Sequence, residues 1–273
     1  MFKSCPLACT IHVSDITLSR GGKPLYESFN HVFKGGKITS ILGPSGCGKT
    51  SLLHIISSLL KPQIGSISLS CSAEKNHSAS DIKPSYLFQE HRLLPWYTAE
   101  KNISLILEGR QTLDGTLIYD KKSAAEAASD FLHKVGLSGY AQRYPSQLSG
   151  GERQRVSLAR AFAFPSPVLL MDEAFQSQDI HLKLQLMDLL YKLHEESPRT
   201  VLMVTHDIRE ALSLSSHVLV LSGSPLVKRL DEDVPSKGLP SKTYIQFPKV
   251  LHDLECSILQ ILASINECPV YPV

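Results

Sequence analysis

The sequence predicts an α/β fold in which helices pack on a mostly parallel sheet, with a helical subdomain inserted into the chain. Short apolar segments recur along the 273 residues, and helical patterns separate several of them, an alternation typical of parallel sheets. From about Gln89 to Phe164 the strand signals fade and helical patterns take over, notably at 123–135 and 152–164. The segment 165–167, Pro-Ser-Pro, marks the return to the sheet. The expected strands are 38–42, 86–88, 168–171, 201–204 and 218–221.

The chain is expected to have three parts. Residues 1–88 and 166–230 form the α/β core, residues 89–165 the helical subdomain, and residues 231–273 a linker and a helical tail. The linker is expected at 231–242, which is charged and rich in Pro, Gly and Ser. An apolar stripe at helical spacing follows and predicts a helix that packs on the core, with docking of a partner as the alternative. The stripe consists of Val250, Leu251, Leu254, Ile258, Ile261, Leu262 and Ile265.

Composition and charge exclude several classes of protein. Hydrophobic residues make up 42% of the chain and charged residues 20%, as in ordinary globular proteins. The net charge of +2 provides no field that would attract nucleic acid. No apolar run approaches the roughly 18–20 residues that a membrane span needs, and the N-terminus lacks the apolar core of a secretory signal. The six cysteines show no CxxC pair and no zinc-ligand spacing, so we expect free thiols in a reducing, cytosolic compartment.

Residues 43–50 match the pattern G-x-x-x-x-G-K-T, between an expected strand and an apolar helical pattern that runs to Lys61-Pro62. The glycines allow successive backbone N–H groups to point at phosphate oxygens, and the helix start adds its positive dipole end. We expect Lys49 to neutralise the β- and γ-phosphates and the Thr50 hydroxyl to ligate Mg²⁺. The motif predicts a nucleoside triphosphate site. The expected contacts are Gly43, Pro44, Ser45, Gly46, Cys47, Gly48, Lys49, Thr50 and Ser51.

A second motif closes the apolar run 168–171 with two carboxylates, Asp172 and Glu173. Ligands of parallel sheets gather beyond the carboxyl ends of the strands, which places these acids beside the phosphate loop. Asp172 fits the acid that holds Mg²⁺ in phosphate-loop enzymes. Glu173 fits a general base that orients and deprotonates the attacking water.

Residues 148–155 read Leu-Ser-Gly-Gly-Glu-Arg-Gln-Arg. Two glycines at a helix start form a second site for an anion, and Ser149 and Glu152 also have the spacing of a capping box. The segment resembles the LSGGQ signature of ATP-binding cassette (ABC) proteins. Together with the phosphate loop and the acidic strand end, this resemblance covers residues 8–230, nearly all of the chain before the tail.

The resemblance implies a phosphate-loop (RecA-like) ATPase core that uses ATP and Mg²⁺. It also implies that a second copy of the chain, or a related cassette, pairs with it head to tail. Each ATP would lie between the phosphate loop of one chain and Ser149, Gly150 and Gly151 of the other. ATP binding would close this dimer, and hydrolysis would release it.

Three further residues match motifs of the family. Gln89, which follows an expected strand, resembles the Q-loop glutamine that senses Mg²⁺ and the γ-phosphate. His206 follows the expected strand 201–204 and resembles the switch histidine that contacts the γ-phosphate and supports the catalytic glutamate. Asp179 resembles the D-loop aspartate. The resemblance therefore implies Glu173 and His206 as catalytic residues, and Thr50, Gln89 and Asp172 around the metal.

The segment 88–96, Phe-Gln-Glu-His-Arg-Leu-Leu-Pro-Trp, resembles ABC importers of the nitrate/sulfonate/taurine type, a form that also occurs in importers of pyrimidine vitamin precursors. In this family the region touches the membrane subunits, so Leu93, Leu94 and Trp96 are expected to form a docking patch; packing within the subdomain is the alternative. The expected partners are two transmembrane permease subunits and, indirectly, an extracytoplasmic solute-binding protein. The chain would lie peripherally on the cytoplasmic face of the inner membrane. The alternatives are an ABC exporter ATPase and a soluble ABC ATPase of DNA repair or translation.

The sequence departs from the family pattern at several positions. The aromatic residue that usually stacks on adenine is replaced by Arg20, whose guanidinium can also stack, or its role falls to Tyr26. Ala174 stands where a Pro usually follows the catalytic glutamate. Gln176 and Gln178 stand where the D-loop commonly has small or apolar residues, which weakens the assignment of Asp179.

Overall fold

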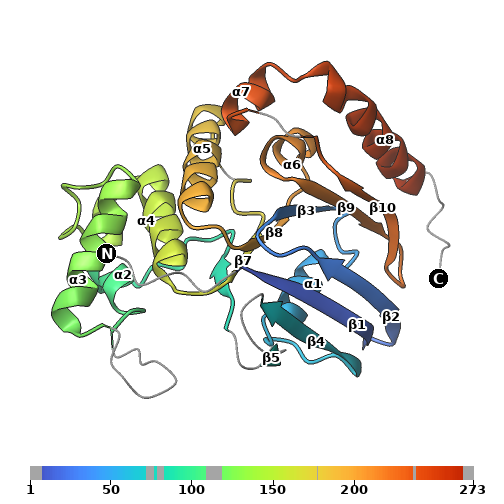
Figure 1. The fold of residues 1–273 in the computed structure, drawn as a ribbon, viewed down its shortest axis with the longest axis horizontal. Coiled ribbons are helices and arrows are strands. Elements are labelled where there is room, and N and C mark those ends of the chain that lie inside the picture. Colours follow the sequence, from blue (N-terminus) through green and yellow to red (C-terminus); the bar gives the residue numbers. More distant parts are fainter. Residues whose placement is uncertain are drawn as a thin grey trace.

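The computed structural model describes residues 8–71, 77–78, 83–108, 119–176, 178–235 and 238–266. Within them lie a six-stranded sheet of order β10-β9-β3-β8-β7-β6 and a four-stranded sheet of order β2-β1-β4-β5 (Figure 1). The strands are β1 (Cys9–Arg20), β2 (Lys23–Phe33), β3 (Ile38–Leu42), β4 (Ile64–Cys71), β5 (His77–Ser78), β6 (Ser85–Leu87), β7 (Val168–Asp172), β8 (Thr200–Val204), β9 (His217–Ser222) and β10 (Val227–Asp233). The helices are α1 (Lys49–Ile56), α2 (Ala99–Ser104), α3 (Lys121–Lys134), a 3-10 turn (Pro145–Gln147), α4 (Gly150–Ala163), α5 (Ile180–Glu196), α6 (Ile208–Leu214), α7 (Pro240–Ile245) and α8 (Lys249–Asn266).

The six-stranded sheet is the predicted parallel core. The five predicted strands form β3, β6, β7, β8 and β9, each within one residue of the expected bounds, and all of them pair in parallel. Side chains alternate between the two faces of β7. Val168 and Leu170 pack in a cluster with α1 and the four-stranded sheet, whereas Leu169 and Met171 pack with α4 and α5. This burial on both faces explains the uninterrupted apolar run.

The four-stranded antiparallel sheet was not predicted. Its long strands alternate between buried and exposed positions; in β1, for example, Ile11 and Val13 are buried but Ser14 and Asp15 are exposed. The buried residues of β1 and β2 cover α1 from the side opposite the parallel sheet. Because a half-exposed strand has only a short apolar repeat, its sequence signal is weaker than that of the uniformly apolar strands.

Helix α1 is shorter than the sequence pattern indicates. The apolar spacing predicts a helix up to Leu60, but α1 ends at Ile56. Ser58 has a φ of 60°, a left-handed conformation that stops a helix. Leu59 is consequently 66% exposed and does not continue the buried stripe.

Helices occupy the chain between β6 and β7, as predicted. The expected helices at 123–135 and 152–164 are α3 and α4, and the short α2 precedes them. Together they form the green lobe at one end of the molecule (Figure 1). Side chains from α2, α3 and α4 share one buried cluster with α5 and one face of the sheet, which ties the lobe to the core.

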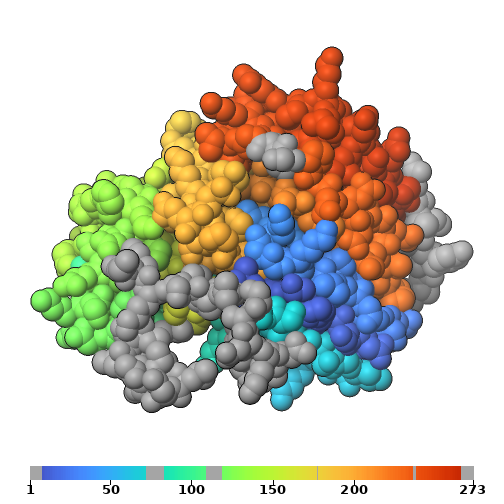
Figure 2. All heavy atoms as spheres, viewed as in Figure 1, coloured from blue at the N-terminus to red at the C-terminus, as the bar shows by residue number. Residues whose placement is uncertain are grey.

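The C-terminal region packs on the core instead of following a free linker. The linker predicted at 231–242 is wrong, because Asp231 lies in β10 and Pro240 begins α7. The tail helix α8 buries Leu251, Leu254 and Ile258 against α6 and β9, which confirms that this part of the stripe packs on the core, whereas Val250 is 62% exposed. These C-terminal residues cover the upper edge of the molecule, away from the green lobe (Figure 2). Among the described residues, each helix is too short or too polar to cross a bilayer.

The expectation that all cysteines are free thiols is also wrong. Cys9 and Cys71 form a disulfide, whereas Cys47 and Cys256 are free. The two half-cystines face each other in the antiparallel ladder of β1 and β4, with their Cα atoms 4.3 Å apart, at the short end of the separations that disulfides bridge. Their separation of 62 residues hides the pair from any search for local cysteine motifs.

Reduction of this disulfide should lower the stability of the purified protein. A bond that closes a loop of this length restricts the unfolded chain, and its loss typically costs about 2–4 kcal/mol. Urea unfolding with and without a reductant measures the change, and the C9S/C71S double variant should match the reduced protein and be insensitive to reductant. An unfolding midpoint of the wild type that does not change on reduction would show that the bond contributes nothing.

Candidate functional site

The phosphate loop lies between the end of β3 and the start of α1. Gly43, Gly46 and Gly48 have φ values of 151°, 77° and 116°, which side chains with a Cβ rarely adopt. Gly43 also has no room for a side chain, because a Cβ there would lie 2.1 Å from the Leu221 carbonyl oxygen. The loop therefore needs glycine both for its backbone conformation and for its close approach to β9.

Lys49 and Thr50 lie at the start of α1, beside the end of β7. The Lys49 ammonium donates to the carbonyl oxygens of Gly43 and Pro44 at 2.8 and 2.7 Å, so the side chain folds back over the loop. The Thr50 hydroxyl donates to Asp172 Oδ1 at 3.1 Å. The structure thus brings together a hydroxyl and a carboxylate that lie 122 residues apart in the sequence. Both are hard oxygen ligands of the kind that Mg²⁺ prefers.

The parallel pairing of β7 with β8 places Glu173 and His206 at the same edge. Asp172 faces Val204 in the ladder, and the Glu173 N–H donates to the Val204 carbonyl at 3.0 Å. Glu173 has a φ of 49°, a left-handed conformation that costs a non-glycine residue about 1 kcal/mol or more. Strained backbone of this kind clusters at functional sites. His206 is exposed two residues beyond β8.

The signature segment begins α4. Ser149 Oγ accepts from the Glu152 N–H at 3.3 Å, and Glu152 Oε2 accepts from the Ser149 N–H at 2.7 Å, so the capping box is present. A Cβ on Gly150 would meet no atom within 4 Å, whereas one on Gly151 would lie 2.8 Å from a Leu182 methyl carbon. Ser149 is exposed. The helix start therefore presents its hydroxyl and open glycine outward from this chain.

Gln89 and Asp179 have local partners in this chain. The Gln89 amide donates to Gln176 Oε1 at 3.0 Å, which joins the loop after β6 to the loop after β7. Asp179 caps α5 and accepts from the Leu182 N–H at 3.0 Å. Their expected roles around the nucleotide stay predictions, with Gln176 now placed as the neighbour of Gln89.

Sequence reasoning missed Gln154 and Arg160, two residues of α4 that connect these motifs. Gln154 of α4 is fully buried; it donates to the Ala174 carbonyl at 2.7 Å and pairs with His91 Nδ1 at 2.5 Å. Burial lowers the pKa of His91 below its usual value. The side chain of Arg160 also binds the carbonyl of His91, at 2.9 Å. The signature helix is thus hydrogen bonded both to the loop after Glu173 and to the segment after Gln89. Gln154 lies inside the signature pattern, but only the fold reveals its partners.

A buried ionic cluster holds the helix that follows His206. Lys183 of α5 contacts Asp207 Oδ2 and Glu210 Oε2, each at 2.6 Å, and Tyr244 of α7 donates to Asp207 at 2.9 Å. Burial, opposed by Lys183, raises the pKa of Glu210. Burial also raises the pKa of Asp207, but the hydrogen bond from Lys183 and that from the Glu210 backbone outweigh it and lower the pKa overall. The tail therefore contacts the residue next to His206.

Tyr26 is unsuited to stack on adenine. Its side chain is fully buried, and its hydroxyl donates to the Gly48 carbonyl at 2.5 Å. This hydrogen bond holds the backbone of the phosphate loop at Gly48. Burial raises the pKa of the Tyr26 phenol. Arg20 is exposed at the end of β1 and lines a hollow of about 310 Å³ together with Ser51 and His54. The prediction that Tyr26 could stack on adenine is therefore wrong, and Arg20 stays the residue predicted to stack on it.

Comparisons with known proteins agree on one family. The profile of the ABC transporter family matches residues 26–176. The chain is 39% identical over 215 residues to the taurine import ATP-binding protein TauB of Escherichia coli (strain K12) and to that of Shigella flexneri serotype 5b (strain 8401), covering 79% of this chain and 80% of each relative.

Solved structures show the same relationship. The dimeric ATP-binding cassette MJ0796, in a post-hydrolysis state bound to ADP and Pi, is similar with a TM-score of 0.66 and 29% identity, over 83% of this chain and all of that one. A second dimeric structure of MJ0796 gives the same values. The motifs of the sequence thus form a phosphate loop, an acidic strand end and a signature helix within one cassette fold. The chain belongs to the ABC transporter family.

Proposed function

We propose that this chain is the ATP-hydrolysing, energy-coupling subunit of an ABC importer for a small solute. One observation carries the proposal: Thr50 of the phosphate loop and Asp172 of β7 lie 3.1 Å apart, at the edge where Glu173 and His206 also lie. Phosphate-binding backbone, a hydroxyl–carboxylate pair, a base and an imidazole are the groups that ATP hydrolysis requires at one place.

Each residue contributes a separate part of the chemistry. Loop N–H groups and the Lys49 ammonium stabilise charge on the β- and γ-phosphates. The Glu173 carboxylate accepts a proton from the water that attacks the γ-phosphorus, while His206 holds the γ-phosphate and the glutamate in place. Thr50, Asp172 and Gln89 would hold Mg²⁺, which when bound neutralises charge on the phosphates. ADP and phosphate are the products.

We propose that a second copy completes the site. The signature residue Ser149 is exposed and there is open space beside Gly150, which suits a γ-phosphate held by a partner. The similar cassette MJ0796 is dimeric with ADP and Pi. In this arrangement each ATP joins Lys49 of one copy to Ser149 of the other, so that closure depends on nucleotide.

We propose that residues 1–88 and 166–233 act as the nucleotide-binding core, residues 89–165 as the coupling subdomain, and helices α7 and α8 as a stabilising tail. Trp96 is 65% exposed beside the segment of His91, which is hydrogen bonded to α4. An exposed tryptophan is typical of a docking surface. Movement of a membrane subunit against Trp96 would reach the signature helix through His91 and Gln154.

The importer assignment rests on the similarity to TauB, whose name describes taurine import, and on the segment 88–96. The cargo is proposed to be a sulfonate-type or related small solute, or a pyrimidine vitamin precursor. An extracytoplasmic binding protein would deliver it to two permease subunits. The chain would then work at the cytoplasmic face of the inner membrane, bound through those subunits.

Replacement of the proposed base should separate ATP binding from turnover. In Glu173→Gln the amide cannot take the proton, so hydrolysis should fall about 10²- to 10⁴-fold while ATP binding persists and a stable dimer accumulates. Phosphate release and size-exclusion chromatography with ATP measure the two effects. Glu195→Gln, an exposed change on α5, is the control. Turnover of Glu173→Gln near the wild-type rate would exclude Glu173 as the base.

Loss of the exposed tryptophan should weaken docking without affecting the ATP site. Purification of the tagged chain from native membranes should recover two integral membrane proteins, and Trp96→Ala should reduce their recovery about tenfold or more, as expected for a central aromatic contact. Leu59→Ala removes an equally exposed apolar side chain, at 66%, and should leave recovery unchanged. Recovery of a soluble nucleic-acid or ribosome complex would refute the transport function.

A further inference from the structure

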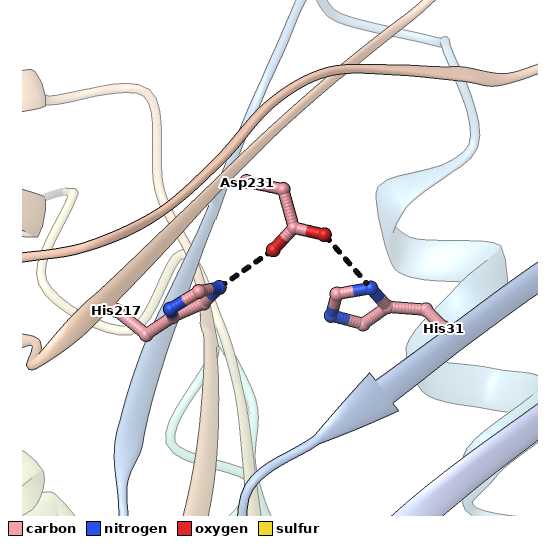
Figure 3. A group of neighbouring side chains, drawn as sticks. All are labelled: His31, His217 and Asp231. Atoms are coloured by element: carbon pink, nitrogen blue, oxygen red, sulfur yellow. Dashed lines mark hydrogen bonds and ion pairs between the residues drawn. The ribbon is translucent and has the colours of Figure 1, made fainter.

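Three side chains with metal-binding groups meet between the edges of the two sheets. His31 comes from β2, the edge strand of the four-stranded sheet, whereas His217 and Asp231 come from β9 and β10 of the six-stranded sheet (Figure 3). His217 Nε2 lies 2.7 Å from Asp231 Oδ1, and His31 Nδ1 lies 3.5 Å from Asp231 Oδ2. One ligand atom from each residue lies within 4.8 Å of the other two.

Each ring nitrogen of His217 faces a carboxylate oxygen. His217 Nδ1 lies 2.8 Å from Asp233 Oδ1, and the Lys34 ammonium donates to both Asp233 oxygens at 2.9 Å. In the tautomer in which Nδ1–H donates to this carboxylate, the Nε2 lone pair faces a carboxylate oxygen of Asp231. Two acceptors at that distance repel unless a proton or a metal ion lies between them. A carboxylate behind the distal nitrogen is the usual support of a metal-bound histidine.

His31 supplies an independent observation. Its side chain is 4% exposed and its ring packs edge-on against Phe33, with centroids 4.4 Å apart. Within the described part of the chain, His31 Nε2 is buried without a hydrogen-bond partner. A buried polar atom left unpaired is costly and needs an explanation. A metal ion bound at Nε2 would provide the missing partner, and Nδ1 would keep its contact with Asp231.

We propose that His31, His217 and Asp231 bind a divalent transition-metal ion of the Zn²⁺ class, with water at the fourth position. Two imidazoles and one carboxylate suit Zn²⁺, Co²⁺ or Fe²⁺ and not Mg²⁺, which prefers oxygen ligands alone. Ligand atoms around tetrahedral Zn²⁺ lie roughly 3.3 Å apart. The contacts with Asp231 are 2.7 and 3.5 Å and the whole group lies within 4.8 Å, so the side chains would move to bind the ion. The group lines a surface hollow of about 510 Å³, which leaves room for the water.

The ion would join the two sheets at their edges. Lys228 Nζ lies 3.6 Å from Asp231 Oδ2 and neutralises that carboxylate without the metal, so binding would displace this contact. The His217–Asp233–Lys34 chain would orient the site from behind. Neither the phosphate loop nor the signature helix contributes a ligand, so this inference does not depend on the proposed ATPase function.

Direct metal titration of the full chain tests the proposal. Isothermal titration with Zn²⁺, without nucleotide or Mg²⁺ and in a Cys256→Ser background, should show one site per chain, and Zn²⁺ at about a hundredfold excess over Kd should raise the Tm by roughly 5 °C. Co²⁺ should give the visible absorption of a tetrahedral nitrogen–oxygen site. His31→Gln and His217→Gln should each weaken binding tenfold or more, and Asp233→Asn about 10- to 100-fold.

The control is His252→Gln, which alters an exposed histidine paired with Glu255 and should bind like the parent. Circular dichroism confirms that each variant is folded, and the Co²⁺ spectrum reports the site directly. No binding by the parent, binding unchanged in His31→Gln or His217→Gln, or binding lost in His252→Gln would each overturn the proposal. In the first case a proton, not a metal, lies between His217 and Asp231.

Discussion

The pairing of β7 with β8 is the constraint on which the catalytic edge depends. Its register sets Asp172 opposite Val204, and the next hydrogen bond, from the Glu173 N–H to Val204, fixes the glutamate in a left-handed backbone. His206 lies two residues after β8, and the Thr50 hydroxyl of α1 donates a hydrogen bond to Asp172. Because β7 is buried on both faces, the register rests on these backbone hydrogen bonds and on the polar residues that follow the strand, and not on an alternation of apolar and polar side chains.

The signature helix is connected to this edge through buried polar groups rather than through apolar packing alone. Gln154 bonds the loop behind Glu173 on one side and His91 on the other, and buried hydrogen bonds of this kind specify one arrangement because any alternative leaves them unmet. The ionic cluster of Lys183, Asp207 and Glu210 holds the start of α6 against α5. Tyr244 of the tail donates a hydrogen bond to Asp207 in this cluster. Short, specific contacts therefore connect the signature helix both to the loop after Glu173 and to the segment that contains His91.

Much of the core could be read from sequence because its signals are local. The apolar run before Asp172 reflects burial on both faces of the sheet, and the glycines around Lys49 reflect close backbone approach. Each of these patterns therefore predicts its own structure. The disulfide of Cys9 with Cys71, the strand that contains Asp231 and the partners of Gln154 depend on residues far apart in the chain, and no local pattern reveals them. Tyr26 was ambiguous for the same reason: only the packing of β2 under α1 shows that its ring is buried. The packing of one sheet against the other, which no local pattern reveals, places His31 near His217.

The central claim is that each ATP site is shared between two copies of the chain. Lys49→Ala disables a phosphate loop, and Gly150→Asp puts a carboxylate where the structure has open space, so it should spare the fold and repel the partner's nucleotide. Each variant alone should be inactive, but a mixed dimer contains one intact site, so the ATPase rate of an equal mixture should recover to about a quarter of wild type if the copies pair at random. A mixture no more active than its two components, or a fully active Gly150→Asp, would contradict the account.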